Sequence, residues 1–288
     1  MHAEQITAAC THLGEGPVWD PSTGLLHWVD LLAGSVLTMA PPASHIARAQ
    51  AGAVASAVRP TTTGGLVVAV QRGFAVLPAG AEEAVALPEL WQDPTVRMND
   101  GGCDPQGRFY AGSMAYDEAP GRGRLWRLDH DGTTTAVLDE VTISNGLAWS
   151  PDGHTAYYVD TGTGRVDAFD FDPVDGTFDG RRPVVWVPAS AGKPDGLAVD
   201  ADGRLWVALW GGSAVHCYGP NGRLQEIVDL PVRQVTACTF GGPGLEDLFI
   251  TTAREGVADP EPSAGALFHI RPGAQGMPVQ PFAGKLTA

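Results

Sequence analysis

The sequence predicts an all-β protein, a six-bladed β-propeller that forms a single domain over residues 1–288. Turn signals rich in Gly, Asp and Pro recur about every 40 to 50 residues, which is the period of a four-stranded blade. Short runs rich in Val, Tyr, Phe and Trp lie between the turns, as expected for β-strands. The chain has 37 Gly and 23 Pro and no sustained helical spacing of apolar residues. Long helices are therefore not expected.

Six turn signals mark the expected blades in chain order: DPSTG at 20–24, TTTGG at 61–65, DPQG at 104–107, SPDG at 150–153, DADG at 200–203 and, more weakly, GGPG at 241–244. The strands beside them include LLHWVD, GLVVAV, GRFYAGS, TAYYVD, RLWVAL and EDLFIT. Four acidic residues in these turns are interpreted as turn chemistry: Asp20, Asp104, Asp152 and Asp202. Residues around 4–10 are expected to complete the blade formed by the C-terminal strands, because a propeller closes by pairing strands from its two ends.

Charge and cysteine content narrow the class of protein. The net charge is −15 and no basic run occurs, which argues against nucleic-acid partners and against anionic membranes. The four cysteines have no zinc-site spacing and are expected to be buried apolar residues: Cys10, Cys103, Cys217 and Cys238. No secretory signal and no membrane span are recognised, so we expect a cytoplasmic protein, a monomer or weak homo-oligomer.

Four polar side chains occupy one position of the internal repeat: Glu15, Asn99, Asn145 and Asp195. The turn glycine follows eight residues after the last three and nine residues after Glu15, so one extra residue must be accommodated in the first repeat. Equivalent positions in a closed array of repeats face a common axis. Two carboxylates and two amides on one axis indicate a site for a hard cation.

Glu15, Asn145 and Asp195 each precede a Gly that begins an apolar strand. Any one of them can be explained as a loop residue before glycine. Three at one position of the repeat, two of them acidic, favour a site. Oxygen ligands of this kind suit Ca²⁺, Mg²⁺ or Mn²⁺ better than a zinc centre of His and Cys.

The R-M-N-D-G run places Arg97 and Asn99 on the same side of a strand. A planar Arg beside an amide suits a carbonyl, hydroxyl or carboxylate ligand. The alternative is a structural Arg97 paired with Asp100 or another acid. The following loop, AGSMAYDEAPG, carries Asp117 and Glu118 and is expected to overhang the channel mouth. The sequence has no G-x-S-x-G, H-E-x-x-H or Walker A motif.

These motifs resemble the gluconolactonase family of senescence marker protein (regucalcin). The likeness runs from residue 12 to about residue 283 and is carried by GEGPVWD, RMNDGGCDPQGRFYAGSM, ISNGLAWSPDG, PDGLAVDADGRLWVA and TACTFGG…DLFITTAREG. The resemblance implies a six-bladed propeller. It also implies a divalent metal held by Glu15, Asn145 and Asp195, and a substrate bound by Arg97, Asn99 and Asp117. Asp117, where the animal proteins have Glu, and the preceding Tyr116 depart from the animal pattern, so a different sugar preference is expected.

The activity implied by the resemblance is metal-dependent opening of a sugar (aldono-)lactone to the aldonic acid. Asp195 would act as metal ligand and general base, and the cation would polarise the lactone carbonyl. Ca²⁺ is the first expectation for the metal, with Zn²⁺, Mn²⁺, Mg²⁺ and Fe²⁺ as alternatives. Two other functions stay open: a metal-dependent phosphotriesterase-like hydrolase on the same fold, and a non-catalytic calcium-binding propeller.

Overall fold

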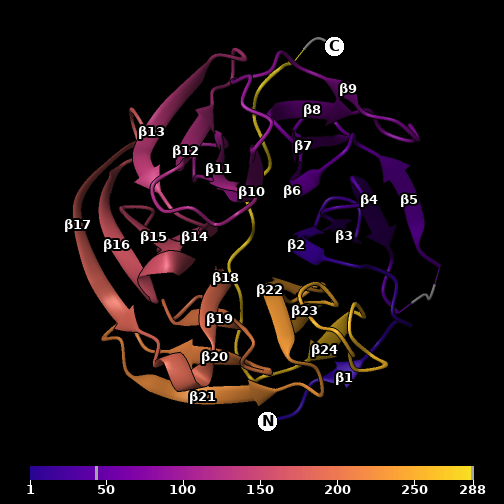
Figure 1. Cartoon of the computed structure of the whole chain (residues 1–288), viewed down its shortest axis with the longest axis vertical. Helices are drawn as coiled ribbons and strands as arrows, with labels where there is room; N and C mark the ends of the chain where they lie inside the picture. Colours follow the sequence, from indigo (N-terminus) through magenta and orange to yellow (C-terminus); the bar gives the residue numbers. More distant parts are fainter. Residues whose placement is uncertain (43–44, 287–288) are drawn as a thin grey trace.

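The computed structural model describes residues 1–42 and 45–286, and within them the chain is all-β, as predicted. Its only helical segments in these residues are two single turns of 3₁₀-helix, η1 (Thr161–Thr163) and η2 (Ala189–Ala191). The sheets stand around a central axis like the sectors of a disc (Figure 1). This is the radial arrangement of a β-propeller.

Four of the sheets have four antiparallel strands each, hydrogen-bonded in chain order. The first contains β2 (Gly14–Asp20), β3 (Leu25–Asp30), β4 (Ser35–Met39) and β5 (Ala47–Gln50). The second contains β6 (Ala55–Pro60), β7 (Leu66–Val70), β8 (Gly73–Leu77) and β9 (Val85–Ala86). The third contains β10 (Val96–Cys103), β11 (Phe109–Ala115), β12 (Gly123–Leu128) and β13 (Thr134–Val141). The fourth contains β14 (Ser144–Trp149), β15 (Thr155–Asp160), β16 (Arg165–Asp172) and β17 (Thr177–Trp186).

The remaining strands form an eight-stranded sheet whose two halves are joined by one residue pair, Trp210 with Gln234. One half contains β18 (Lys193–Val199), β19 (Leu205–Trp210), β20 (Ala214–Tyr218) and β21 (Leu224–Asp229). The other contains β22 (Gln234–Gly241), β23 (Asp247–Ala253), β24 (Phe268–Ile270) and the N-terminal β1 (Glu4–Gln5). β1 pairs with β24, so the predicted pairing of the two ends of the chain is confirmed, over a shorter strand than expected.

The first strand of each four-stranded unit lies next to the axis. These strands, β2, β6, β10, β14, β18 and β22, contact one another in a closed ring. The hydrophobic core lies between neighbouring sheets. Val18 and Val29 of the first sheet, for example, pack with Val58 and Val68 of the second. Each sheet thus buries both faces against its neighbours and holds its inner strand at the axis.

The turns after the inner strands show how the repeat is built. The buried Asp104 carboxylate accepts hydrogen bonds from the backbone N–H of Gln106 and Arg108, and Nε of Arg108 lies 2.5 Å from its second oxygen. Asp200 does the same with Asp202 and Arg204. The structural acid of the fifth turn is therefore Asp200, whereas the side chain of Asp202 is exposed.

The extra residue of the first repeat lies in its turn. The N–H of Gly24 bonds to the carbonyl of Asp20, four residues back, at 2.9 Å. In the third repeat the N–H of Gly107 reaches Asp104, three residues back, also at 2.9 Å. The longer turn absorbs the insertion, so Glu15 keeps the same position on its strand as Asn99 has on β10.

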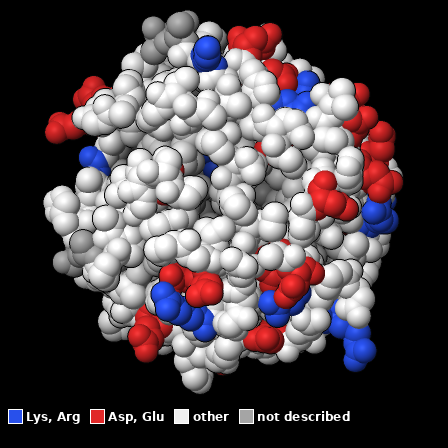
Figure 2. Space-filling model, turned by 180° about the vertical axis from the view of Figure 1, so that it is seen from behind, with Lys and Arg blue, Asp and Glu red and all other residues white. Residues whose placement is uncertain are grey.

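Charged side chains lie mainly away from the centre on the face shown in Figure 2, where the centre is hollowed. None of the four cysteines forms a disulfide. Cys103, Cys217 and Cys238 are buried, as expected, whereas Cys10 is only partly buried. No helix in residues 1–42 or 45–286 has the length and apolar character needed to cross a bilayer.

Candidate functional site

Every inner strand has an irregularity in its pairing at the corresponding position of its repeat. The register shifts between Glu15 and Val18 on β2, between Met98 and Gly101 on β10, and correspondingly on β6, β14, β18 and β22. Bulges of this kind turn a side chain away from the plane of its sheet and are common beside active sites. The residues at or beside the irregularity lie five positions before the first residue of each turn: Glu15, Ser56, Asn99, Asn145, Asp195 and Thr236.

Ser56 and Thr236 are the two members of this set that the sequence-based prediction missed. The five-residue spacing to Thr61 and to Gly241 was the signal that would have found them. Both side chains are fully buried, and their hydroxyls donate to backbone carbonyls, Ser56 to Ala69 and Thr236 to Gly14. Both hydroxyls are thus occupied by backbone carbonyls, and the other four residues supply the polar groups of the candidate site.

A chain of hydrogen bonds links three neighbouring sheets through these residues. The guanidinium of Arg97 donates to Oδ1 of Asn99 at 2.6 Å, and Nδ2 of Asn99 donates to Oδ1 of Asn145 at 2.8 Å. Nδ2 of Asn145 donates to the hydroxyl of Thr161 at 2.7 Å, which in turn donates to the carbonyl of Pro194 at 2.7 Å. The chain ends beside Asp195. It fixes which way both amides point, because each nitrogen has a partner that accepts.

The two acidic members, Glu15 and Asp195, are both buried, and the charge of Glu15 affects the pKa of Asp195. Burial, and then the nearby charge of Asp100, raises the pKa of Glu15 to about 8. Burial also raises the pKa of Asp195 well above its usual range, with Glu15 and Asp100 adding to the shift. Oδ1 of Asp195 is buried and has no hydrogen-bond partner. Burying such an oxygen costs free energy unless a positive charge or a hydrogen-bond donor lies beside it.

Asp100 joins this group, although sequence considerations suggested it only as a partner of Arg97. Its carboxylate accepts the N–H of Gly101 at 2.7 Å. Burial raises the pKa of Asp100, and the positive charge of Arg59 opposes that rise. Arg97 bonds to Asn99 and to the carbonyl of Met98 instead. The alternative in which Arg97 forms an ion pair with Asp100 is therefore not what the structure contains.

Close packing of the inner strands explains the glycine after Asn145 and after Asp195. A Cβ atom on Gly146 would lie 2.6 Å from the backbone nitrogen of Leu197, and one on Gly196 would lie 2.5 Å from Cβ of Ala237. Neither position has room for a side chain. In each pair, Asn145 or Asp195 supplies a polar side chain that could bind a metal, and the glycine after it lets the backbone lie close to the next inner strand.

Two buried aspartates hold the ends of inner strands in place. Asp30, at the end of β3, accepts the N–H groups of His12 and Leu13, just before β2. Asp160, at the end of β15, accepts those of Thr142 and Ile143, just before β14. Glu15 and Asn145 thus follow segments whose backbone is anchored to the neighbouring strand.

The loop after β11 carries Asp117, which was predicted to bind the substrate, and its neighbours Tyr116 and Glu118. Asp117 is exposed, and its carboxylate accepts the N–H of Ala119 at 3.1 Å, within its own turn. Glu118 adopts a left-handed conformation with φ of 57°. Tyr116 is the residue of this loop that meets the site, because its ring lies over the guanidinium of Arg97 at 5.6 Å.

The donor set fits a hard divalent cation. Within the described part of the chain, no three His, Cys, Asp or Glu side chains gather as a metal-binding group. A cation at the axis would therefore rely on two carboxylates, Glu15 and Asp195, and on amide oxygen from Asn145. The unpartnered Oδ1 of Asp195 and the mutual repulsion of the carboxylates are what a bound cation would relieve.

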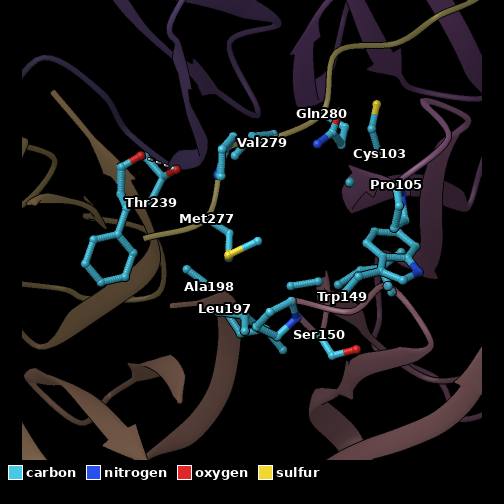
Figure 3. Close-up of a pocket in the computed structure, with 18 of the residues that line it drawn as sticks. Cys103, Pro105, Trp149, Ser150, Leu197, Ala198, Thr239, Met277, Val279 and Gln280 are labelled. Atoms are coloured by element: carbon cyan, nitrogen blue, oxygen red, sulfur yellow. Dashed lines mark hydrogen bonds between the residues drawn. The ribbon is translucent and has the colours of Figure 1, made fainter. Parts of the chain in front are cut away.

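A cavity of about 230 Å³ lies further along the same inner strands, on the side of the turns. Leu147, Leu197 and Thr239 line it from β14, β18 and β22. Met277 and Gln280 of the C-terminal segment lie on one side and Trp149 on another (Figure 3). Glu15, Asn145 and Asp195 are not among its lining residues, whereas Arg59, whose charge acts on Asp100, is one of them.

Comparison with known proteins identifies the family of this chain. Residues 13–254 match the family model described as SMP-30/Gluconolactonase/LRE-like region. The chain is 37% identical over 286 residues to regucalcin of Sus scrofa, covering 95% of each chain. It is 35% identical over 280 residues to a putative sugar lactone lactonase of Bacillus subtilis, covering 94% of this chain and 95% of that one. Among solved structures, a calcium-binding protein, regucalcin, from Agrobacterium tumefaciens superposes with a TM-score of 0.91 at 26% identity, covering 99% and 98% of the two chains. The chain therefore belongs to the SMP-30/gluconolactonase/LRE-like family.

Proposed function

We propose that this protein is a metal-dependent hydrolase that opens a sugar lactone to the corresponding aldonic acid. The observation that carries the proposal is the buried, unpartnered oxygen on Asp195, whose carboxyl group is close enough to Glu15 to be affected by its charge. Asn145 has the same position in its repeat as these two residues. Family membership and the printed names of relatives, among them a putative sugar lactone lactonase, support the choice of substrate class.

Glu15, Asn145 and Asp195 would hold one divalent cation, for which Ca²⁺ is our first expectation. A solved structure described as a calcium-binding protein, regucalcin, supports that expectation, and oxygen ligands favour Ca²⁺ over softer metals. When bound, the cation supplies a positive charge that polarises the lactone carbonyl. Thr161 orients the amide of Asn145, and Asn99 holds its oxygen from the other side.

Asp195 is the proposed general base. Its carboxylate would take a proton from the attacking water as the new C–O bond forms at the carbonyl carbon. The ring C–O bond then breaks, and the proton passes to the alkoxide that leaves. The product is one molecule, an aldonic acid that carries a new hydroxyl group. Arg97 and Asn99 hold the sugar hydroxyls and position the ring, and Asp117 stays a candidate for the same task.

A panel of aldonolactones, assayed by acid release with and without added divalent metal, tests the proposal. We expect turnover that a chelator removes and Ca²⁺ or another divalent ion restores, and that Asp195→Asn abolishes. Hydrolysis of phosphotriesters without lactone opening would favour the phosphotriesterase-like alternative. Metal binding without turnover of either substrate class would favour a non-catalytic calcium-binding propeller.

We also infer that the two halves of the eight-stranded sheet are separate blades, because a single pair, Trp210 with Gln234, joins them. With the four other sheets this makes a six-bladed propeller, formed by one domain. The unpaired cysteines support a reducing, cytoplasmic location, because disulfides are typical of oxidising compartments.

A further inference from the structure

Tyr116 is held in a fixed place at the mouth of the site, although 45% of its surface is exposed. It directly follows β11, and its backbone N–H bonds to the carbonyl of Thr95 at 2.9 Å. Its hydroxyl accepts a hydrogen bond from Nε2 of Gln71 at 3.2 Å. The carbonyl of Gln71 in turn accepts the N–H of Met98. The ring is therefore anchored at both ends to segments beside Arg97.

The ring covers one face of a guanidinium that already belongs to the site. Cζ of Arg97 lies 5.6 Å from the ring centre, within the range of a cation–π contact. Arg97 uses Nη1 on Asn99 and Met98, whereas its buried Nε has no partner. The side chain thus keeps donor capacity, and Tyr116 limits the direction from which a ligand can approach it.

Tyr116 contacts Arg97, whereas Asp117 on the same loop bonds within its own turn. The carboxylate of Asp117 closes its own turn on Ala119, and Asp117 is exposed. An exposed aromatic ring beside a row of polar groups is suited to a molecule with one apolar face and one polar edge. A sugar lactone ring has this character, because its C–H bonds present an apolar face and its hydroxyls form the edge.

We propose that Tyr116 is a specificity-determining residue whose ring forms a wall for the C–H face of the lactone, while Arg97 and Asn99 bind its hydroxyls. This inference rests on the proposed function. It predicts selection for lactones that present an unsubstituted C–H face to the ring, over isomers that place a hydroxyl there, because a hydroxyl against the ring would lose its partner.

The test compares Tyr116→Leu, which keeps bulk but removes the aromatic face, with Tyr116→Phe, which removes only the bond to Gln71. Trp186→Leu is the matched control, because Trp186 is also an exposed ring over an arginine, Arg165, at 5.2 Å, but on the outer strand β17. Binding of a sugar lactam, the non-hydrolysable amide analogue of the lactone, is measured by calorimetry beside lactone kinetics and Ca²⁺ affinity.

We expect Tyr116→Leu to weaken lactam binding and raise KM by about 5- to 10-fold, with kcat and Ca²⁺ affinity within twofold of wild type. Tyr116→Phe should change both by less than threefold, and Trp186→Leu should change neither. If Tyr116→Leu behaves like the Trp186→Leu control, or if Asp117→Ala causes the larger loss, this inference is wrong while the proposed function stands. If wild type neither binds the lactam nor opens any lactone, both are wrong.

Discussion

Nδ2 of Asn99 donates a 2.8 Å hydrogen bond to Oδ1 of Asn145, so that two residues 46 positions apart in the chain form one unit across neighbouring sheets. Because Asn145 also donates to Thr161, its amide is clamped from both sides. The oxygen that would serve a cation is therefore held by the fold before any ligand arrives, which lowers the cost of ordering the site on binding.

Thr161 is predicted to matter although it is not itself a ligand. Thr161→Val removes the acceptor for Asn145 and the donor to Pro194, so metal affinity should fall about 10-fold, in line with losses of residues that orient metal ligands. Thr163→Val is the control, since its hydroxyl bonds to the carbonyl of Asp160 in the same 3₁₀ turn. Calorimetric titration with Ca²⁺ measures both, and equal affinities in the two variants would contradict the prediction.

Asp195→Asn should affect stability with opposite signs in the presence and absence of metal. Without a cation, the substitution removes a carboxyl group whose ionised form is disfavoured by burial and then by the charges of Glu15 and Asp100. The melting temperature should therefore rise by about 2–4 °C, which corresponds to about 1 kcal/mol. With excess Ca²⁺, wild type should gain stability by mass action, and Asp195→Asn should not. Thermal scans with chelator and with Ca²⁺ check both signs, and a metal-induced shift that survives in the variant would place the cation elsewhere.

Arg97→Lys should impair substrate binding but not metal binding. Nη1 alone donates to Asn99 and to the carbonyl of Met98, so the rest of the planar guanidinium is left for a ligand, and a single ammonium group has no such second donor. We expect KM for lactones to rise about 10-fold or more, with Ca²⁺ affinity within twofold of wild type. Steady-state kinetics and a Ca²⁺ titration on the same preparation decide the matter. Unchanged kcat/KM on every lactone tested would move the substrate pocket away from Arg97.

The burial of His27 predicts that the protein loses stability in acid. Burial lowers its pKa from 6.5 to about 4, against a smaller opposing effect of Asp20. Between these values the unfolded chain binds more protons than the folded one, so the contribution is complete above pH 6.5 and is lost as pH falls towards 4. It amounts to at most about 3 kcal/mol.

Urea unfolding at pH 7 and pH 4.5 tests this dependence. His27→Gln should reduce the loss of unfolding free energy between the two pH values, because Gln does not titrate and can still bond to Thr38. The exposed His154→Gln serves as control and should leave the loss unchanged. A wild-type pH dependence retained in His27→Gln would assign the acid sensitivity to other groups.

The sequence by itself determined the repeat and the identity of the polar residues on it. The turn chemistry is local, because a Gly and an Asp in a short turn bond to backbone atoms within four residues, as Asp104 and Asp200 do. The pairing of the chain ends also followed from the repeat, since the last sheet lacks a strand that only residues near the N-terminus can supply. Glu15, Asn145 and Asp195 were recognisable because their spacing to the turns is the same.

Only the tertiary structure decided which of these side chains act together. Ser56 and Thr236 share the spacing of Glu15, yet Ser56 bonds to the carbonyl of Ala69 on the next strand of its sheet. Thr236 bonds to that of Gly14, which lies 222 positions away in the chain. The same holds for Tyr116, whose position over Arg97 depends on Gln71 in another sheet. Spacing along a strand sets the face on which a side chain emerges, whereas its partner and its burial depend on the neighbouring sheets that pack around the axis.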